Sequence, residues 1–410
     1  GAHSLGERQG YTGVLGHVDD RRHAGVDAIL KAYNGPKTTW QRDRLYPVLV
    51  RSVERDSVSV SAGYDAFSLS RKSLAWTKPY ALDSTNNRGV AVPLRQTFSR
   101  GDIVLVRLTK DGDVALAQIP PVEGAFIAVD NYTRQLTAAV GGIDYTLSQF
   151  DRSEQACRSP GSTFKPIVYA EALERGLTLA SVFDDTPLTI FDRQKNRFWK
   201  PRNPNGRYLG PMTMIEAIRR SANIPVIRAL RQVGSESVAL LAKRLGVDEE
   251  MYPDDGLALG ASCLTAQSLL RVYSTLALGG SNRALSTIER VIDRHGQTRF
   301  DQTSPLAQVA PPRFRIDGLV RLAVSETEQS LSPTTGYLMQ QALHRVVRSG
   351  TGRRAKFGHL PLAGKTGTTD KFDAWFAGFS HQFTAISWIG ADNNERALGT
   401  GDAPVGKEAA

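Results

Sequence analysis

The sequence predicts an α+β protein in which a small β-barrel domain precedes a larger domain of mixed helices and strands. Residues 41–120 contain several short strand-like runs, and a Pro-Pro pair at 120–121 ends them. Beyond that pair, strand-like segments stand on both sides of a block of helical segments, an order that closes one sheet with helices packed on it. We therefore expect a linker or fragment of an adjoining region at 1–40, a barrel domain at 41–121 and an α+β domain at 122–410.

The first 120 residues divide into two kinds of sequence. Residues 1–40 are rich in Gly, Arg and His and show little hydrophobic periodicity, which is typical of a linker. In the part that follows, residues 57–61 alternate polar and apolar, and residues 102–108 lead through a Lys-Asp-Gly turn into residues 114–119. Strands joined by an Asp-Gly turn form a hairpin. Several such short strands predict a small barrel of the OB type.

The larger domain is predicted to begin and end in strands. Its first two strands are expected at 124–130 and 135–142, and the chain returns to strands at 360–368, 373–379 and 383–390. Apolar residues recur at helical spacing between these strands. The predicted helices are 164–176, 213–233, 236–245, 265–278 and 333–347.

The charge of the chain favours anionic partners without choosing among them. The formal net charge is +10 and the pI about 9.6, which suits nucleic acid, an acidic membrane surface or an anionic cell-wall polymer. The interleaved aromatic and basic residues of single-strand binders are not evident, so we expect no nucleic-acid partner. No long apolar run and no signal peptide are found, so we expect a soluble protein or the soluble part of a longer one.

The cysteines and histidines do not indicate a metal site. Cys157 and Cys263 form no C-x-x-C pair, so a structural disulfide is compatible with the sequence but not required by it, and we interpret Cys263 as a small buried hydrophobe. The seven histidines are dispersed, and His344 and His359 are expected to be structural or on the surface. We therefore expect no metal ion and no cofactor.

Three short motifs stand in order along the larger domain. They are S-x-x-K at Ser162–Lys165, S-x-N at Ser221–Asn223 and K-T-G at Lys365–Gly367. One such motif arises by chance in a chain of this length, but the ordered set is that of serine β-lactamases and penicillin-binding proteins. The set predicts a serine acyltransferase. Its catalytic residues are expected to be Ser162, Lys165, Ser221, Asn223 and Lys365.

The residue types within the motifs suit this chemistry. Serine is a weak nucleophile that needs an adjacent base, and Ser162 and Lys165 lie one turn apart on the same face of a helix. Lys165 acts as a base only when neutral, so burial and a neighbouring positive charge, for which Lys365 is the candidate, are expected to lower its pKa. Ser221 and Asn223 lie two apart on a strand or an irregular loop, where both can face one cavity. Ser221 is expected to relay protons, and Asn223 to hold Lys165 and a substrate amide.

The K-T-G segment is predicted to be the substrate-binding strand. Alternation along a strand points Thr366 and Thr368 away from the face that carries Lys365. The glycine between the threonines permits close approach of substrate or of another backbone segment. The backbone N–H groups of Ser162 and Thr368 are expected to form an oxyanion hole, and the threonine hydroxyls to bind a carboxylate. The substrate-binding residues are expected to be Thr366, Gly367, Thr368 and Thr369.

Longer segments around these motifs resemble the class A penicillin-binding proteins. The resemblance covers residues 122–395 and is most specific in 158–176, in Gly350-Thr-Gly, and in the run from Gly364 to the Trp-Phe-Ala-Gly at 375–378. The barrel segment at 41–120 is similar to an OB-like insertion that some members carry.

The resemblance implies a function and partners. The function is a D,D-transpeptidase that cross-links peptidoglycan stem peptides ending in D-Ala-D-Ala and is inhibited by β-lactam antibiotics. The full-length form would be a bifunctional, membrane-anchored synthase with a glycosyltransferase domain and regulatory proteins, acting in the periplasm or on the outer face of the inner membrane. In this chain we expect neither the anchor nor the glycosyltransferase domain, nor the further strand and helix that the family adds beyond the position of Ala410.

Four alternatives stay open at this point. A D,D-carboxypeptidase differs only in using water as the acceptor. A class A β-lactamase needs an E-x-x-L-N loop, which we do not find between Asn223 and Lys365. A penicillin-sensing receptor would carry an apolar residue in place of Asn223. Nucleic-acid binding through residues 41–120 would show as salt-dependent retention of DNA.

Overall fold

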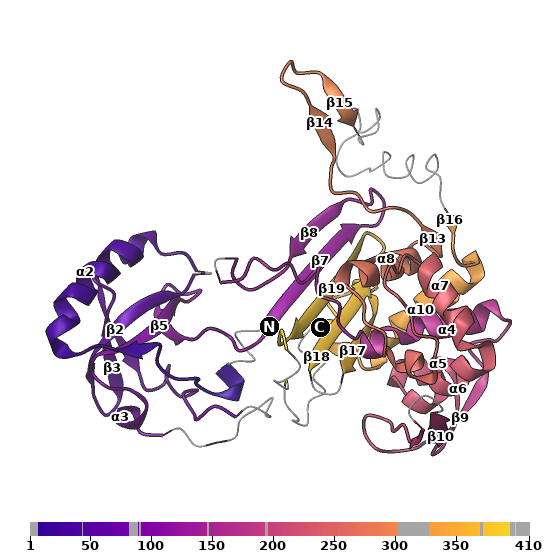
Figure 1. Cartoon of the computed structure of the whole chain (residues 1–410), viewed down its shortest axis with the longest axis horizontal. Coiled ribbons are helices and arrows are strands. Elements are labelled where there is room, and N and C mark those ends of the chain that lie inside the picture. The colour runs from indigo at the N-terminus through magenta and orange to yellow at the C-terminus, as the bar shows by residue number, and fades with distance from the viewer. Residues whose placement is uncertain are drawn as a thin grey trace. The chain divides into compact units, whose positions relative to one another are not determined.

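The protein is described by a computed structural model (Figure 1). The structure describes residues 7–42, 44–81, 89, 92–145, 147–192, 196–301, 328–369, 372–393 and 398. The contacts divide the chain into two compact units. Unit 1 comprises Gly1–Glu123 and Ala391–Ala403, and unit 2 comprises Gly124–Gly390 and Pro404–Ala410.

Unit 1 is built on an antiparallel sheet with strand order β1-β5-β2-β3-β4 and with β6 paired to β5. The strands are β1 Gly16–His17, β2 Tyr46–Val53, β3 Ser57–Ser61, β4 Ala66–Ser70, β5 Asp102–Leu108 and β6 Val114–Ala117. The helical segments are η1 Asp20–Arg22, α2 His23–Asn34, η2 Lys37–Thr39 and α3 Leu94–Thr97. Burial alternates along β3 as its period-two sequence predicts, with Val58 and Val60 in the core. The unit has its own apolar core, which also contains Trp40 and Tyr46.

The segment that the sequence predicts to be a linker contributes to this unit. Strand β1 pairs with β5, and helix α2 packs against β2. Only His23, Leu30 and Asn34 of α2 are buried. Because two of these three side chains are polar, apolar residues mark few positions of the buried face, which weakens a prediction from periodicity.

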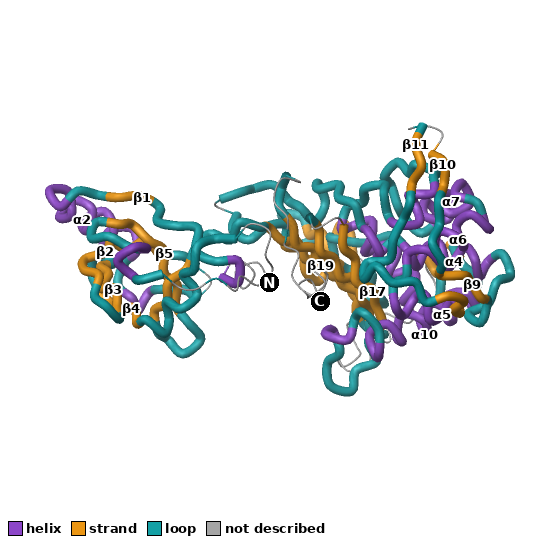
Figure 2. Tube along the Cα trace, turned by 90° about the horizontal axis from the view of Figure 1, so that it is seen from below, coloured by secondary structure: helices purple, strands orange, loops and turns teal. Residues whose placement is uncertain are grey.

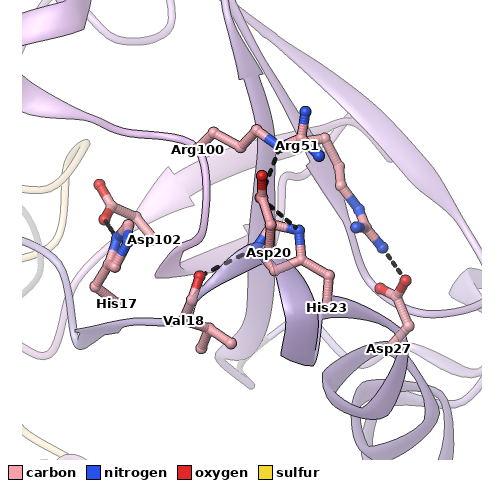
Figure 3. Close-up of polar contacts among 8 residues, drawn as sticks. All are labelled: His17, Val18, Asp20, His23, Asp27, Arg51, Arg100 and Asp102. Carbon is pink, nitrogen blue, oxygen red and sulfur yellow. Dashed lines mark hydrogen bonds and ion pairs between the residues drawn. The ribbon is translucent and has the colours of Figure 1, made fainter.

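Polar contacts also hold this segment to the turn before β5 (Figure 3). The Nδ1 atom of His17 lies 2.8 Å from a carboxylate oxygen of Asp102, and Arg100 Nε donates to Asp20 over 3.0 Å. Asp20 also lies 3.4 Å from the ring of His23. Residues near the start of the unit are thus held by ion pairs as well as by the sheet.

Unit 2 contains a five-stranded antiparallel sheet with the order β17-β18-β19-β7-β8. Its strands are β7 Glu123–Asp130, β8 Leu136–Val140, β17 Ala363–Thr369, β18 Asp373–Phe379 and β19 Phe383–Gly390. Strands from both ends of the unit's sequence thus lie in one sheet, which confirms the predicted α+β class.

In the described part of unit 2, helices α8 and α10 pack against this sheet, and α5, α6, α7 and α10 pack around α4 (Figure 2). The helices of this part lie between β8 and β17 in the sequence. They are α4 Lys165–Glu174, α5 Met214–Arg220, α6 Asn223–Val233, α7 Ser235–Arg244, α8 Ala266–Ala277 and α10 Pro333–Ser349, with 3₁₀ segments η3 Gly161–Thr163, η4 Asp255–Leu259 and η6 Arg353–Ala355. Every residue of α4 from Lys165 to Leu173 is buried, which identifies it as a core helix. In the described part of the chain, no helix has the length and apolar character needed to cross a bilayer.

In the described residues of unit 2, eight further short strands form antiparallel pairs. They are β9 Val182–Asp185 with β12 Gly210–Thr213, β10 Ile190–Asp192 with β11 Arg197–Trp199, β13 Ser281–Asn282 with β16 Glu328–Gln329, and β14 Arg290–Ile292 with β15 Thr298–Asp301. The first two pairs lie in the sequence between α4 and α5, and β9 and the loop after β11 supply residues to the site described next.

Candidate active site

Ser162 lies on the one-turn segment η3, directly before helix α4. Gly161 adopts a left-handed backbone conformation with φ of +52°, and a Cβ there would lie 2.4 Å from the carbonyl oxygen of Thr368. A Cβ at Gly367 would lie 2.5 Å from the carbonyl oxygen of Pro160. Side chains do not fit at either position, so the two glycines allow β17 to lie against the turn that carries Ser162. The predicted close approach at Gly367 is therefore made by another backbone segment.

The hydroxyl group of Ser221 lies between two buried lysines. Lys365 Nζ donates to Ser221 Oγ over 2.8 Å, and Lys165 Nζ lies 3.4 Å from the same oxygen. Lys165 also donates to the Ser221 carbonyl over 2.7 Å and to Asn223 Oδ1 over 2.6 Å. The structure thus brings together Lys165, Ser221, Asn223 and Lys365 from three separate segments of the chain, namely α4, the break between α5 and α6, and β17.

The electrostatic surroundings favour a neutral Lys165. Its side chain and that of Lys365 are 1% and 0% exposed. Burial first, and the charge of Lys365 second, hold the pKa of Lys165 well below its ordinary value. Burial lowers the pKa of Lys365 to about 7. Lys165 is therefore suited to accept a proton near neutral pH, which is the direction that the sequence predicts.

The second motif lies at a break between two helices, which corrects the prediction of one helix over 213–233. Ser221 adopts a left-handed conformation with φ of 59° and ψ of 35°, which ends α5 at Arg220, and α6 begins at Asn223. A non-glycine residue in this region is strained. Because Lys165 binds the carbonyl groups of both Ser221 and Ala222 from a distant segment, local sequence does not reveal the break.

Two residues outside the motifs position Asn223. Asn203 Oδ1 accepts the backbone N–H of Asn223 over 2.7 Å, and Asn203 Nδ2 donates to Asp185 over 2.7 Å. Asp185 is 1% exposed and also accepts the backbone N–H of Leu209. Asp185 is not among the site residues that the sequence predicts, because a single Asp at the end of a strand carries no recognisable signal.

The K-T-G strand turns its threonines toward different partners. Thr366 Oγ1 lies 2.9 Å from Thr351 Oγ1, within the Gly350-Thr-Gly segment, while Thr368 is exposed. Thr369 Oγ1 donates to Asp373 over 2.7 Å. The hydroxyl of Thr369 is thus used within the protein, whereas Thr368 is open to solvent.

The segment before Ser162 is fastened to the rest of unit 2. Arg158 Nε donates to Asp373 over 2.9 Å, and Trp375 Nε1 donates to the Ser159 carbonyl over 2.9 Å. Cys157 forms a disulfide with Cys263. Cys263 is exposed as well as bonded, so its interpretation as a buried hydrophobe was wrong.

Two cavities of unit 2 meet at Ser162. The first has a volume of about 690 Å³ and includes Ser221, Thr366 and Thr368 in its lining. The second, of about 980 Å³, includes Asn223, Thr368 and Thr369. A molecule bound across both would pass over Ser162 and the exposed face of β17. His344, on α10, instead bonds through Nδ1 to the carbonyl of Leu362 and lines neither cavity.

Models of two protein families match this chain. The penicillin binding protein transpeptidase domain matches residues 124–409, and the penicillin-binding protein OB-like domain matches residues 11–122. The curated relatives include penicillin-binding protein 1A from Pseudomonas aeruginosa, 30% identical over 86% of this chain and 47% of its own length. Penicillin-binding protein 1A from Neisseria meningitidis is 31% identical over 93% of this chain and 45% of its own length. The chain thus spans about half the length of these relatives.

Solved structures agree with these matches. The crystal structure of penicillin-binding protein 1A from Haemophilus influenzae has a TM-score of 0.82 and 26% identity, and the similarity covers 99% of this chain and 61% of that one. PonA1 from Mycobacterium tuberculosis has a TM-score of 0.59 at 23% identity, over 71% of this chain and 75% of that one, and shows the fold alone. The predicted OB-like domain and transpeptidase fold are both confirmed.

Proposed function

Because the chain belongs to the penicillin-binding protein transpeptidase family and is therefore a serine-type D,D-transpeptidase, we propose that Ser162 is its nucleophile and Lys165 its base. The predicted enzyme class is confirmed by the family, and no finding favours the carboxypeptidase or the β-lactamase. The observation that supports these roles is the pair of buried lysines around Ser221, beside the turn that carries Ser162.

The first half of the proposed reaction forms an acyl-enzyme. Neutral Lys165 accepts the proton of Ser162 Oγ, which attacks the carbonyl carbon of the penultimate D-Ala of a stem peptide. The N–H groups of Ser162 and Thr368 stabilise the oxyanion. As the peptide bond breaks, the proton passes from Lys165 through Ser221 to the amine of the terminal D-Ala, which leaves.

The second half transfers the acyl group to an amine. The amine nitrogen bonds to the acyl carbon, the bond from that carbon to Ser162 Oγ breaks, and the proton of the amine returns to Oγ through the same groups. Thr366 and Thr368 bind the terminal carboxylate through their hydroxyl groups, and the charge of the buried Lys365 attracts it. Asn223 and the backbone of β17 hold the amide of the acyl chain, with Gly367 and Thr369 contributing main-chain contacts.

The parent protein is proposed to be a larger enzyme. Its relatives are about twice as long as this chain and are named penicillin-binding protein 1A. We propose that the full-length protein is anchored in the inner membrane, carries a glycosyltransferase domain, acts on peptidoglycan in the periplasm and responds to regulatory proteins.

Covalent labelling tests the nucleophile. Incubation with benzylpenicillin followed by intact-mass measurement and peptide mapping should give one adduct, on the peptide that contains Ser162. The Ser162→Ala variant should give none while keeping the thermal unfolding curve of the parent chain. An adduct on another peptide, or one that persists in the folded variant, would refute the assignment.

A further inference from the structure

The cavity of about 690 Å³ carries a strong positive charge. Its lining includes the arginines Arg207, Arg219, Arg220, Arg353 and Arg354. Asp185 is the one acidic residue of that lining, and it is buried against Asn203. Glu216, outside the lining, accepts hydrogen bonds from Arg219 and Arg220. Five arginines against these two carboxylates leave three positive charges on this arm of the cleft, which we name the arginine arm.

Arg353 and Arg354 are available to a ligand. Both are exposed, and within the part of the chain that the structure describes neither side chain has a hydrogen-bond or ion-pair partner. They follow the Gly350-Thr-Gly segment, whose Thr351 contacts Thr366 on β17 over 2.9 Å. A Cβ at Gly350 would lie 2.4 Å from the Arg219 carbonyl, so this segment also lies against the end of α5. The backbone therefore holds both arginine pairs beside the proposed carboxylate-binding threonine.

The second cavity has a different character. Its lining combines Phe191 and Trp199 with three basic residues, Arg197, Lys200 and Arg202, and two acidic residues, Asp254 and Asp255. A single net positive charge remains there. The strong positive field is thus confined to one of the two arms that meet at Ser162.

The position of the arginine arm relates it to the leaving group. This step rests on the proposed function, in which Thr366 binds the carboxylate of the terminal D-Ala and the charge of Lys365 attracts it. Thr366 and Ser221 line the arginine arm, whereas Asn223 and Thr369 line the second cavity. The terminal D-Ala is then released into the arginine arm. Because acylation and its reverse pass through the same transition state, an acceptor amine attacks from the place that the leaving amine vacated.

We propose that the arginine arm is the acceptor subsite and selects a peptide with a free carboxylate in addition to the one beside its amine. Arg353 and Arg354 bind that additional carboxylate. Guanidinium groups form two-pronged hydrogen bonds with carboxylates. The same field favours loss of the proton from a bound ammonium group, which leaves the amine nucleophilic.

The ratio of aminolysis to hydrolysis of the acyl-enzyme tests this proposal. The enzyme is acylated with a peptide ending in D-Ala-D-Ala, and D-glutamate and D-glutamine are supplied as competing acceptors at one pH. These amino acids have the same carboxylate beside the amine and similar size, and they differ in the charge of the side chain. We expect D-glutamate to be preferred by about three- to tenfold, the range for a partly exposed charged hydrogen bond.

Substitutions at Arg353 and Arg354 test whether the arginine arm causes the preference for D-glutamate over D-glutamine. The double variant Arg353→Gln/Arg354→Gln should lose the preference for D-glutamate, and Arg353→Lys/Arg354→Lys should keep part of it. The matched control Arg345→Gln/Arg348→Gln removes two exposed charges on α10 that do not line the cavity, so its preference should equal that of the parent chain.

Different failures of the experiment are distinguishable. Without a preference in the parent chain, or with a preference that survives the glutamine variant, the proposal is overturned. Products of water alone, in a protein that still forms the Ser162 adduct, also overturn it and leave the nucleophile standing. A protein that forms no adduct on Ser162 refutes the proposed function itself.

Discussion

At the scale of single residues, the site depends on two lysines that share one hydroxyl group. Both side chains are buried, so each ammonium charge is costly. The cost is lower when the two lysines are not both protonated near neutral pH. The two side chains are not equivalent. Burial and the charge of Lys365 together hold the pKa of Lys165 well below its ordinary value, while burial alone lowers the pKa of Lys365 to about 7. The arrangement suits Lys165 as the neutral base and Lys365 as the charged group that attracts the substrate carboxylate.

This division of roles predicts the pH dependence of acylation. As the pH rises through about 7, Lys365 loses its charge, so binding of the penicillin carboxylate weakens. The second-order rate constant of acylation by benzylpenicillin should fall by about tenfold from pH 7 to pH 9, because the charge of Lys365 no longer attracts the carboxylate. Stopped-flow quenching of the protein's fluorescence measures this rate constant.

The methyl ester of benzylpenicillin is the control for this prediction. It has no carboxylate, so its smaller rate constant should stay level or rise over the same range as more Lys165 becomes neutral. If the rate constants for the acid and the ester fell equally, the loss of rate at alkaline pH would belong to another group. If neither rate constant fell, Lys365 would have no part in carboxylate binding.

At the scale of elements, the site exists because β17 and η3 lie unusually close. A Cβ at Gly367 would lie 2.5 Å from the Pro160 carbonyl and 2.8 Å from the methyl group of Thr163. Gly367→Ala should therefore move the strand from Ser162, lower the acylation rate by at least about tenfold and destabilise unit 2 by about 1–3 kcal/mol. Urea unfolding and penicillin labelling measure the two effects.

A glycine that touches nothing serves as the control for that substitution. Gly25 lies within α2 with no atom near its missing Cβ, so Gly25→Ala should stabilise by about 0.5–1 kcal/mol through helix propensity and leave labelling unchanged. If Gly367→Ala labelled at the parent rate, the close approach would not be needed for catalysis.

Some helices and strands around the site can be predicted from the sequence, and others cannot. Helix α4 was predicted because its apolar residues record burial directly, whereas β17 was predicted as a strand although residues 363–367 are all buried and do not alternate. The break between α5 and α6 was not, because Ser221 is held in its conformation by Lys165 from another helix. The motif residues were found from their order in the chain, whereas Asp185 and the joining of Arg220 to Arg353 in one cavity depend on tertiary packing.

At the scale of the whole molecule, the chain holds two cores rather than one. The core of unit 1 is built from residues such as Val48 and Val106, and that of unit 2 from residues such as Val168 and Trp375. No buried residue belongs to both of these clusters in the described part of the chain. The cavities that meet at Ser162 are lined by residues of unit 2 alone. Stability of unit 1 and chemistry at Ser162 are therefore expected to be separable.

This separation predicts two unfolding transitions in differential scanning calorimetry. Benzylpenicillin should raise the midpoint temperature of only one of them. A covalent ligand stabilises the native state of the unit that holds it and has no direct effect on the other. Val48→Ala removes buried methyl groups of unit 1 and should destabilise that unit by about 2 kcal/mol. The midpoint temperature of the other transition should therefore fall, while that of the penicillin-sensitive transition stays unchanged. A single transition, or two that both move with penicillin and with Val48→Ala, would show instead that the two cores unfold cooperatively and that changes in unit 1 reach the active site.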